Sequence, residues 1–131
     1  MEMIDTGKVQ VASEGDQYLL FTFYSNGEVT TADALQIRKY LDRFNGQVPI
    51  LIHRKASYSL ATDVQLMLMK EAGARFSAAA YMERGHQDVV LTNLAKATYM
   101  KDVRVRSFWK KGEAIAWLNQ FGGLPPKHLK D

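Results

Sequence analysis

Polar and basic side chains gather between residues 53 and 62, after an apolar run and before a helical pattern. Those that could contact an anion are Arg54, Lys55, Ser57, Ser59 and Thr62. Free N–H groups at a helix N-terminus favour phosphate or carboxylate, and neighbouring cations add to that attraction. The alternative is that Ser59 or Thr62 only caps the helix. Because the segment lacks a glycine-rich phosphate loop, the cap is the favoured interpretation.

The residue types and their spacing do not indicate a catalytic site or a metal site. Cysteine is absent, which excludes disulfides, thiol nucleophiles and thiolate metal sites. No two histidines have the i, i+4 spacing of a helical metal site. His53, Ser57 and Asp63 could be imagined as a triad, but no nucleophile elbow accompanies them. The pattern therefore predicts a protein that is not an enzyme and has no metal or cofactor.

A cluster of cations crowds one segment that holds a single acid, Asp102. Its members are Lys101, Arg104, Arg106, Lys110 and Lys111. With Phe108 and Trp109 between them, they could bind single-stranded nucleic acid by stacking and phosphate contacts. The net charge is only +3, however, and cations on an edge strand also prevent aggregation. A solvated edge is the favoured interpretation, and nucleic acid is not expected as a partner.

Methionine can line an apolar groove or a partner surface, because its side chain adapts to irregular shapes. Met67 lies on the apolar stripe of the helix that follows residues 53–62, so core packing is expected for it. Met69 falls off that stripe. We therefore expect Met69 on the face that would meet a protein partner.

Strands and helices alternate along the chain. The alternation around Val9 and Val11 and the aromatic run Tyr18–Tyr24, joined across a Gly turn, predict an antiparallel hairpin. Further strands are predicted at Val48–Ile52, Arg75–Met82 and Val103–Phe108. Helical patterns follow the hairpin and each of these strands, beginning at Thr30 or Thr31, at Ser59 or Thr62, after Gly85, and at Glu113.

Apolar periodicity predicts which side each helix buries. Thr62 and Gln65 fit a capping box at the start of the second helix, and Gly73 is expected to end it. The third helix is predicted to bury Val90, Leu94 and Ala97. The last helix carries an i, i+3, i+4, i+7 stripe made of Ala114, Trp117, Leu118 and Phe121.

This order predicts an α/β fold with a mixed sheet, in which right-handed β-α units follow the hairpin, with about five strands and four helices. We place one domain at residues 1–124 of the 131, with a polar tail at 125–131. The acidic N-terminus does not fit a signal peptide, and no apolar run approaches the roughly 20 residues that span a bilayer. A soluble, cytoplasmic protein is expected.

The closing stretch VRVRSFWKKGEAIAWLNQF resembles the last strand and helix of SpoIIAA-like proteins, the group that includes STAS and STAS/Sec14-type domains. In that group a strand ending in Phe, here Phe108, leads to a helix with Glu-Ala-x-x-Trp-Leu, here Glu113 to Leu118. The segment FSAAAYMERGHQDVVLTNLAKATYMKDVRV is similar to the family's small-residue strand and following helix. The likeness covers roughly Tyr18 to Phe121 and implies the same fold, with Trp117 as a core anchor.

The resemblance also implies classes of function. In the bacterial anti-sigma-factor antagonists of this group, a partner kinase phosphorylates a serine at the start of the helix after the central strand, usually in an Asp-Ser pair. Here Ala61 and Thr62 stand near that position, so the pair is absent and Ser59 or Thr62 is the candidate phosphoacceptor. The leading hypothesis is a non-enzymatic regulatory or protein-binding module, which could form a homodimer.

The alternative hypothesis is a carrier of a small lipid-like or anionic ligand, by resemblance to Sec14-type domains. It predicts a cavity beneath the helices. At this chain length, a cavity large enough for a whole lipid would take much of the core.

Overall fold

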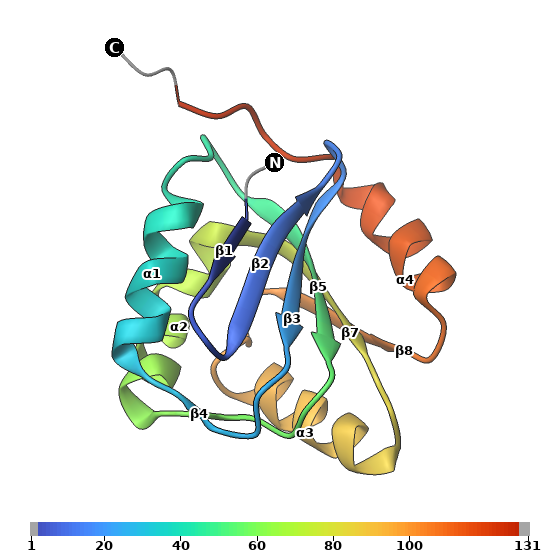
Figure 1. The fold of residues 1–131 in the computed structure, drawn as a ribbon. Helices are drawn as coiled ribbons and strands as arrows, with labels where there is room; N and C mark the ends of the chain where they lie inside the picture. The colour runs from blue at the N-terminus through green and yellow to red at the C-terminus, as the bar shows by residue number, and fades with distance from the viewer. Residues whose placement is uncertain (1–2, 129–131) are drawn as a thin grey trace.

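The computed structural model describes residues 3 to 128 and is built on one six-stranded sheet (Figure 1). Its strands, in spatial order, are β1 (Met3–Asp5), β2 (Val9–Glu14), β3 (Tyr18–Phe23), β5 (Val48–Arg54), β7 (Phe76–Met82) and β8 (Arg104–Phe108). β1, β2 and β3 are antiparallel, and from β3 onward each pair is parallel. The predicted hairpin followed by parallel β-α units in a mixed sheet is confirmed.

Helices cover both faces of this sheet unequally. They are α1 (Thr31–Leu41), α2 (Thr62–Arg75), α3 (His86–Ala97) and α4 (Lys111–Leu118), followed by the short 3-10 helix η1 (Asn119–Phe121). α1, α2 and α3 lie on one face and α4 lies alone on the other (Figure 1). The four predicted helices are confirmed, and the arrangement leaves three helices to build sites on one face.

Three short strands go beyond the five that were predicted. β1 adds an edge to the hairpin, and β4 (Glu28–Val29) pairs in parallel with β6 (Ser59–Leu60) in a separate two-stranded sheet. Strands of two or three residues carry too little alternation to be recognised from sequence. Their pairing nevertheless matters, because β4 and β6 lead directly into α1 and α2.

The start and end of α2 differ from the prediction. Thr62 is the first helical residue, as expected, but the N-cap is Ala61, and no side chain caps the helix. Gln65 Nε2 instead donates to the Leu60 carbonyl at 3.0 Å, so the predicted capping box is wrong. The helix also continues past Gly73, where an added Cβ would lie 2.8 Å from the Asp102 side chain. Gly73 therefore serves close packing rather than helix termination.

The orientation of α3 is the largest departure from expectation. Val90 and Leu94, predicted to be buried, are 66% and 57% exposed. The buried residues of α3 are Asp88, Thr92 and Ala95. The predicted apolar face is thus wrong, and the reason lies in the strands beneath the helix.

The chain beyond Leu124 stays in contact with the domain as far as it is described. The Asn45 N–H donates to the Pro126 carbonyl at 2.8 Å, and the His128 N–H donates to the Arg43 carbonyl at 2.8 Å. Contact therefore does not end at the expected boundary of residue 124. Residues 129–131 of the expected tail lie outside the described residues.

Candidate functional site

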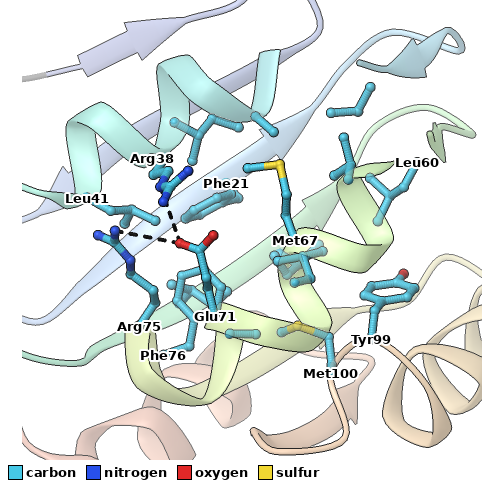
Figure 2. Close-up of a pocket in the computed structure, with 18 of the residues that line it drawn as sticks. Phe21, Arg38, Leu41, Leu60, Met67, Glu71, Arg75, Phe76, Tyr99 and Met100 are labelled. Atoms are coloured by element: carbon cyan, nitrogen blue, oxygen red, sulfur yellow. Dashed lines mark ion pairs between the residues drawn. The ribbon is translucent and has the colours of Figure 1, made fainter. Parts of the chain in front are cut away.

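An apolar cavity of about 120 Å³ lies between α1, α2 and the sheet (Figure 2). Phe21 and Ile50 form part of its floor on the sheet, Ile37 approaches from α1, and Met67 and Leu68 approach from α2. The periodicity of both helices places these side chains inward, which is why the cavity is apolar. A cavity of about 150 Å³ with such a lining can hold a benzene molecule. At about 120 Å³, this cavity has room for at most a single ring or a short hydrocarbon chain, and not for a whole lipid.

Ion pairs between the C-terminal turns of α1 and α2 border the cavity. Glu71 Oε1 lies 3.3 Å from Arg38 Nε and 3.8 Å from Arg75 Nη2, and Arg75 Nη1 lies 2.6 Å from Asp42 Oδ1. Figure 2 shows the Glu71 carboxylate between the two arginines. These side chains are partly exposed, so each pair contributes at most about 1 kcal/mol to stability. The four charges cancel, and the border is neutral as a whole.

A second cavity of about 250 Å³ lies at the segment that the sequence singled out. Arg54, Ser57 and Ser59 line one side of it, and Leu91 and Leu94 of α3 line the other. Tyr58, Leu60 and Tyr99 line both cavities. These three side chains therefore form the wall between an apolar cavity and a more polar one.

Arg54 is buried in a polar network under α3. Its Nη1 lies 2.6 Å from Glu83 Oε1 and donates to Thr92 Oγ1 at 2.9 Å. Thr92 Oγ1 and Ser107 Oγ donate to Glu83 Oε2 at 2.8 and 3.0 Å. The Arg54 side chain is 3% exposed and that of Glu83 is 0% exposed. A buried carboxylate and guanidinium are tolerated only when they are paired and hydrogen-bonded in this way.

This network explains the orientation of α3. Arg54 ends β5, and Glu83 follows β7, so the two charges meet at the carboxyl edge of neighbouring parallel strands. A helix that laid Val90 and Leu94 over them would leave the pair short of hydrogen-bonding partners. The side of α3 with Thr92 and the Asp88 carbonyl satisfies Arg54 instead.

Tyrosines surround the Arg54 guanidinium on the cavity side. Its central carbon lies 4.8 Å from the ring centre of Tyr81 and 5.9 Å from that of Tyr58. The Tyr58 ring also stacks on Phe23, with ring centres 3.8 Å apart. Burial raises the pKa of Tyr58, Tyr81 and Tyr99 above the usual value. All three phenols are therefore neutral at physiological pH.

The expected anion-site residues come together only in part. Arg54 is paired with Glu83 and does not supply a free cation. Arg84 Nη2 lies 3.4 Å from Ser57 Oγ, but Arg84 is itself paired with Asp88 at 2.9 Å. The remaining candidates Lys55, Ser59 and Thr62 are exposed, as is Met69. The cavity wall thus presents paired charges and hydroxyl groups, which suit an uncharged polar group better than an anion.

Sequence reasoning missed Glu83, Thr92 and the tyrosine wall. One signal was present. An arginine that closes the apolar strand VPILIHR is drawn toward the interior, and Glu83 closes the next parallel strand at the same sheet edge. The tyrosines gave no comparable signal, because Tyr58 and Tyr99 come from loops far apart in sequence.

Between residues 3 and 128, the structure shows neither a metal-binding cluster nor a membrane-spanning helix. No group of three or more His, Cys, Asp or Glu side chains is placed to hold a metal ion. No helix in this range is both long enough and apolar enough to cross a membrane.

Comparison with known proteins identifies the fold. The sequence matches no known family profile and no curated protein. The structure is similar to the crystal structure of an uncharacterised protein of the DUF3478 family from Shewanella loihica PV-4, which is described as having a SpoIIAA-like fold. The TM-score is 0.59 at 21% sequence identity, over 84% of this chain and 91% of the other. With its mixed sheet and four helices, this chain has a SpoIIAA-like, STAS-type fold.

Proposed function

We propose that this protein is a non-enzymatic binding module that holds a small apolar molecule between α1, α2 and the sheet. The observation that carries the proposal is the apolar cavity of about 120 Å³ beneath those two helices. The carrier hypothesis from the sequence predicts a cavity beneath the helices, without specifying which helices. The ligand, however, is smaller than a lipid.

The lining also limits the chemistry of the ligand. Phe21, Ile50, Met67 and Leu68 offer no partner for a charge, and burying an unpaired charge among them would cost several kcal/mol. The charged side chains in the lining, Arg38, Glu71 and Arg75, are already paired with one another. Tyr58 and Tyr99 in the far wall can each offer a neutral hydroxyl group. An uncharged ring or short chain, with at most one polar atom, therefore fits this cavity.

Cavity filling provides the test. Ala34 lines the cavity, whereas Ala32 is exposed on the same helix, so Ala34→Leu and Ala32→Leu are matched variants. In a ¹H–¹⁵N NMR titration with benzene, the wild-type protein and Ala32→Leu should show shifts at α1, α2 and β3. Ala34→Leu should show weaker shifts. Equal titration of all three proteins, or no titration of the wild type, would contradict the proposal.

The same pair of variants can be used to search for the natural ligand. Native mass spectrometry of the protein isolated from its own cells, before and after denaturation, separates a non-covalent small molecule from a covalent phosphate and from a bound protein. A small apolar molecule that is lost from Ala34→Leu but retained by Ala32→Leu would support the carrier. A phosphate on Ser59 or Thr62 would favour regulation by a kinase instead.

A protein-binding role through α2 is the second candidate. Leu66 and Met69 are 50% and 42% exposed on this helix, and neither lines either cavity. Such a face suits a regulatory partner or a second copy of the chain. Substituting Thr62 and Met69 together by alanine should weaken partner capture or shift a dimer toward monomer in sedimentation. Unchanged capture and unchanged oligomeric state would exclude this face.

A further inference from the structure

α3 turns an apolar surface outward that no described part of the chain covers. Val90, Leu91 and Leu94 are 66%, 46% and 57% exposed. Their exposure does not result from a loosely placed helix. On the opposite side of α3, Arg54 donates hydrogen bonds to Thr92 Oγ1 and to the Asp88 carbonyl. Turning α3 to bury the three apolar residues would break that buried network. The outward apolar surface is therefore a fixed feature of the fold.

The surface continues beyond the N-terminal end of α3 and along one flank of the helix. At its N-terminal end, His86 lies against Trp109, with ring centres 6.1 Å apart, and Trp109 is 56% exposed. Along its flank, Leu91 and Leu94 also line the 250 Å³ cavity together with Leu60. An apolar ridge thus runs beside a concave groove. We refer to the ridge of Val90, Leu91, Leu94 and Trp109, with this groove, as the α3 surface.

The charges around the α3 surface are mostly positive. The exposed residues of α3 include Lys96 and no acid. Lys101 follows the helix, and Lys110 and Lys111 follow Trp109, whereas Arg84 before the helix is paired with Asp88. Asp102 and Glu113 are the exposed acids in the same flanking segments. A second copy of this chain would bring cations against cations, which disfavours self-association through this surface.

We propose that the α3 surface binds an acidic amphipathic helix of another protein. His86, Val90 and Leu94 recur every fourth residue and span about 12 Å, or roughly two helical turns, which matches the spacing of anchors on a partner helix. The groove beside them receives side chains, whereas a flat lipid surface would leave it unfilled. Acidic residues flanking the apolar face of the partner complement the lysines. The side chains of Tyr58, Leu60 and Tyr99 divide this surface from the cavity beneath α1.

Two designed peptides test the proposal. Both are about five helical turns long, with leucines on one face; the other face carries glutamates in one peptide and lysines in the other. We expect the acidic peptide to bind and to change the fluorescence of the exposed Trp109, with affinity falling as salt is added. The lysine peptide should not bind. Equal binding of the two peptides, or no binding of the acidic one, would overturn the proposal.

Variants locate the binding surface. Val90→Ser with Leu94→Ser should weaken binding of the acidic peptide by about tenfold or more, because anchors at an interface core dominate affinity. Leu35→Ser changes a leucine on α1 that is 48% exposed and should leave binding unchanged. Unchanged binding in the double variant, or an equal loss in Leu35→Ser, would refute the assignment to α3.

Lipid is the competing occupant and has its own result. If vesicles of anionic phosphatidylglycerol bind through Val90 and Leu94 while the acidic peptide does not bind at all, the surface is a membrane contact and the proposal is wrong. The test is also independent of the apolar ligand. Ala34→Leu fills the cavity under α1 and should not alter binding of the acidic peptide, so failure of one proposal leaves the other standing.

Discussion

α3 and α4 pack on opposite faces of the same sheet, and they bury different kinds of residue: α4 buries apolar side chains, whereas α3 buries mainly polar ones. α4 buries Ala114 and Leu118 against Ala78 and Ala80 of β7, all at 1% exposure or less. α3 buries Asp88 and Thr92 and leaves its larger apolar residues outside. The strands decide the difference. Small apolar residues of β7 face α4, whereas the Arg54–Glu83 pair faces α3 and must be supplied with hydrogen bonds.

The comparison shows that apolar periodicity identifies a helix more reliably than it identifies the buried side. A buried ion pair rarely adds net stability, but removing one partner leaves the other charge buried and alone. α3 is therefore held by a network that is costly to break, and α4 by contacts that are favourable to make.

The largest effect is expected from breaking the pair under α3. Arg54→Met leaves Glu83 buried without its cation, so the free energy of unfolding should fall by about 3 to 5 kcal/mol. Urea denaturation of the variant and the wild type measures this change in the free energy of unfolding. Adding Glu83→Leu should recover much of the loss, since an apolar pair of similar volume needs no charged partner. A loss below about 1 kcal/mol for Arg54→Met would mean that the pair behaves as an exposed one.

A slightly smaller effect is expected under α4. Leu118 is 1% exposed, and Leu118→Ala should reduce the free energy of unfolding by about 2 to 5 kcal/mol through lost burial and a cavity. The same denaturation experiment applies. A change within about 0.5 kcal/mol, as for a surface site, would show that α4 does not pack as described.

A pH effect is expected next to Arg54, on the opposite face of β5. Burial, together with Lys55 and Lys111, lowers the pKa of His53 below 6.5. Below pH 6.5 the unfolded chain therefore holds more protons at this residue than the folded protein does, so stability falls as pH decreases through this range. His53→Gln should flatten this dependence of urea midpoints between about pH 7 and 5. Parallel profiles of variant and wild type would contradict it.

The smallest effect is expected on the outer side of α3. Leu94→Ala makes the same substitution as Leu118→Ala, but at a side chain that is 57% exposed. The free energy of unfolding should change by no more than about 0.5 kcal/mol. A loss comparable to that of Leu118→Ala would show that Leu94 is covered in solution, and the contrast between the two helices would disappear.

The sequence predicts the framework of the fold because its signals there are local and repeated. The hairpin, the strands around Val48–Ile52 and Phe76–Met82, and the Ala-x-x-Trp-Leu helix each carry their own pattern of periodicity and turn residues. The orientation of α3 could not be predicted in that way. It depends on Arg54 and Glu83, which meet only when β5 and β7 pair.

The candidate anion site stays a prediction, and only some of its residues lie together. Arg54, Ser57 and Ser59 do line one cavity, at the carboxyl end of a parallel strand where ligands are expected. The neutralisation of Arg54 and the wall of Tyr58 and Tyr99 depend on contacts between distant segments. The apolar cavity likewise depends on how closely α1 and α2 approach the sheet, which no local pattern specifies.

The two ends of the apolar cavity are held by different forces. β4 and β6 join the N-terminal ends of α1 and α2 through backbone hydrogen bonds, and the Ala61 N–H adds one to the Val29 carbonyl at 3.0 Å. The C-terminal ends are joined by the pairs of Glu71 and Asp42 with arginines. Ionic strength screens exposed charges but not backbone hydrogen bonds. The connection through the small sheet should therefore resist added salt, whereas the connection through the ion pairs at the opposite end should weaken.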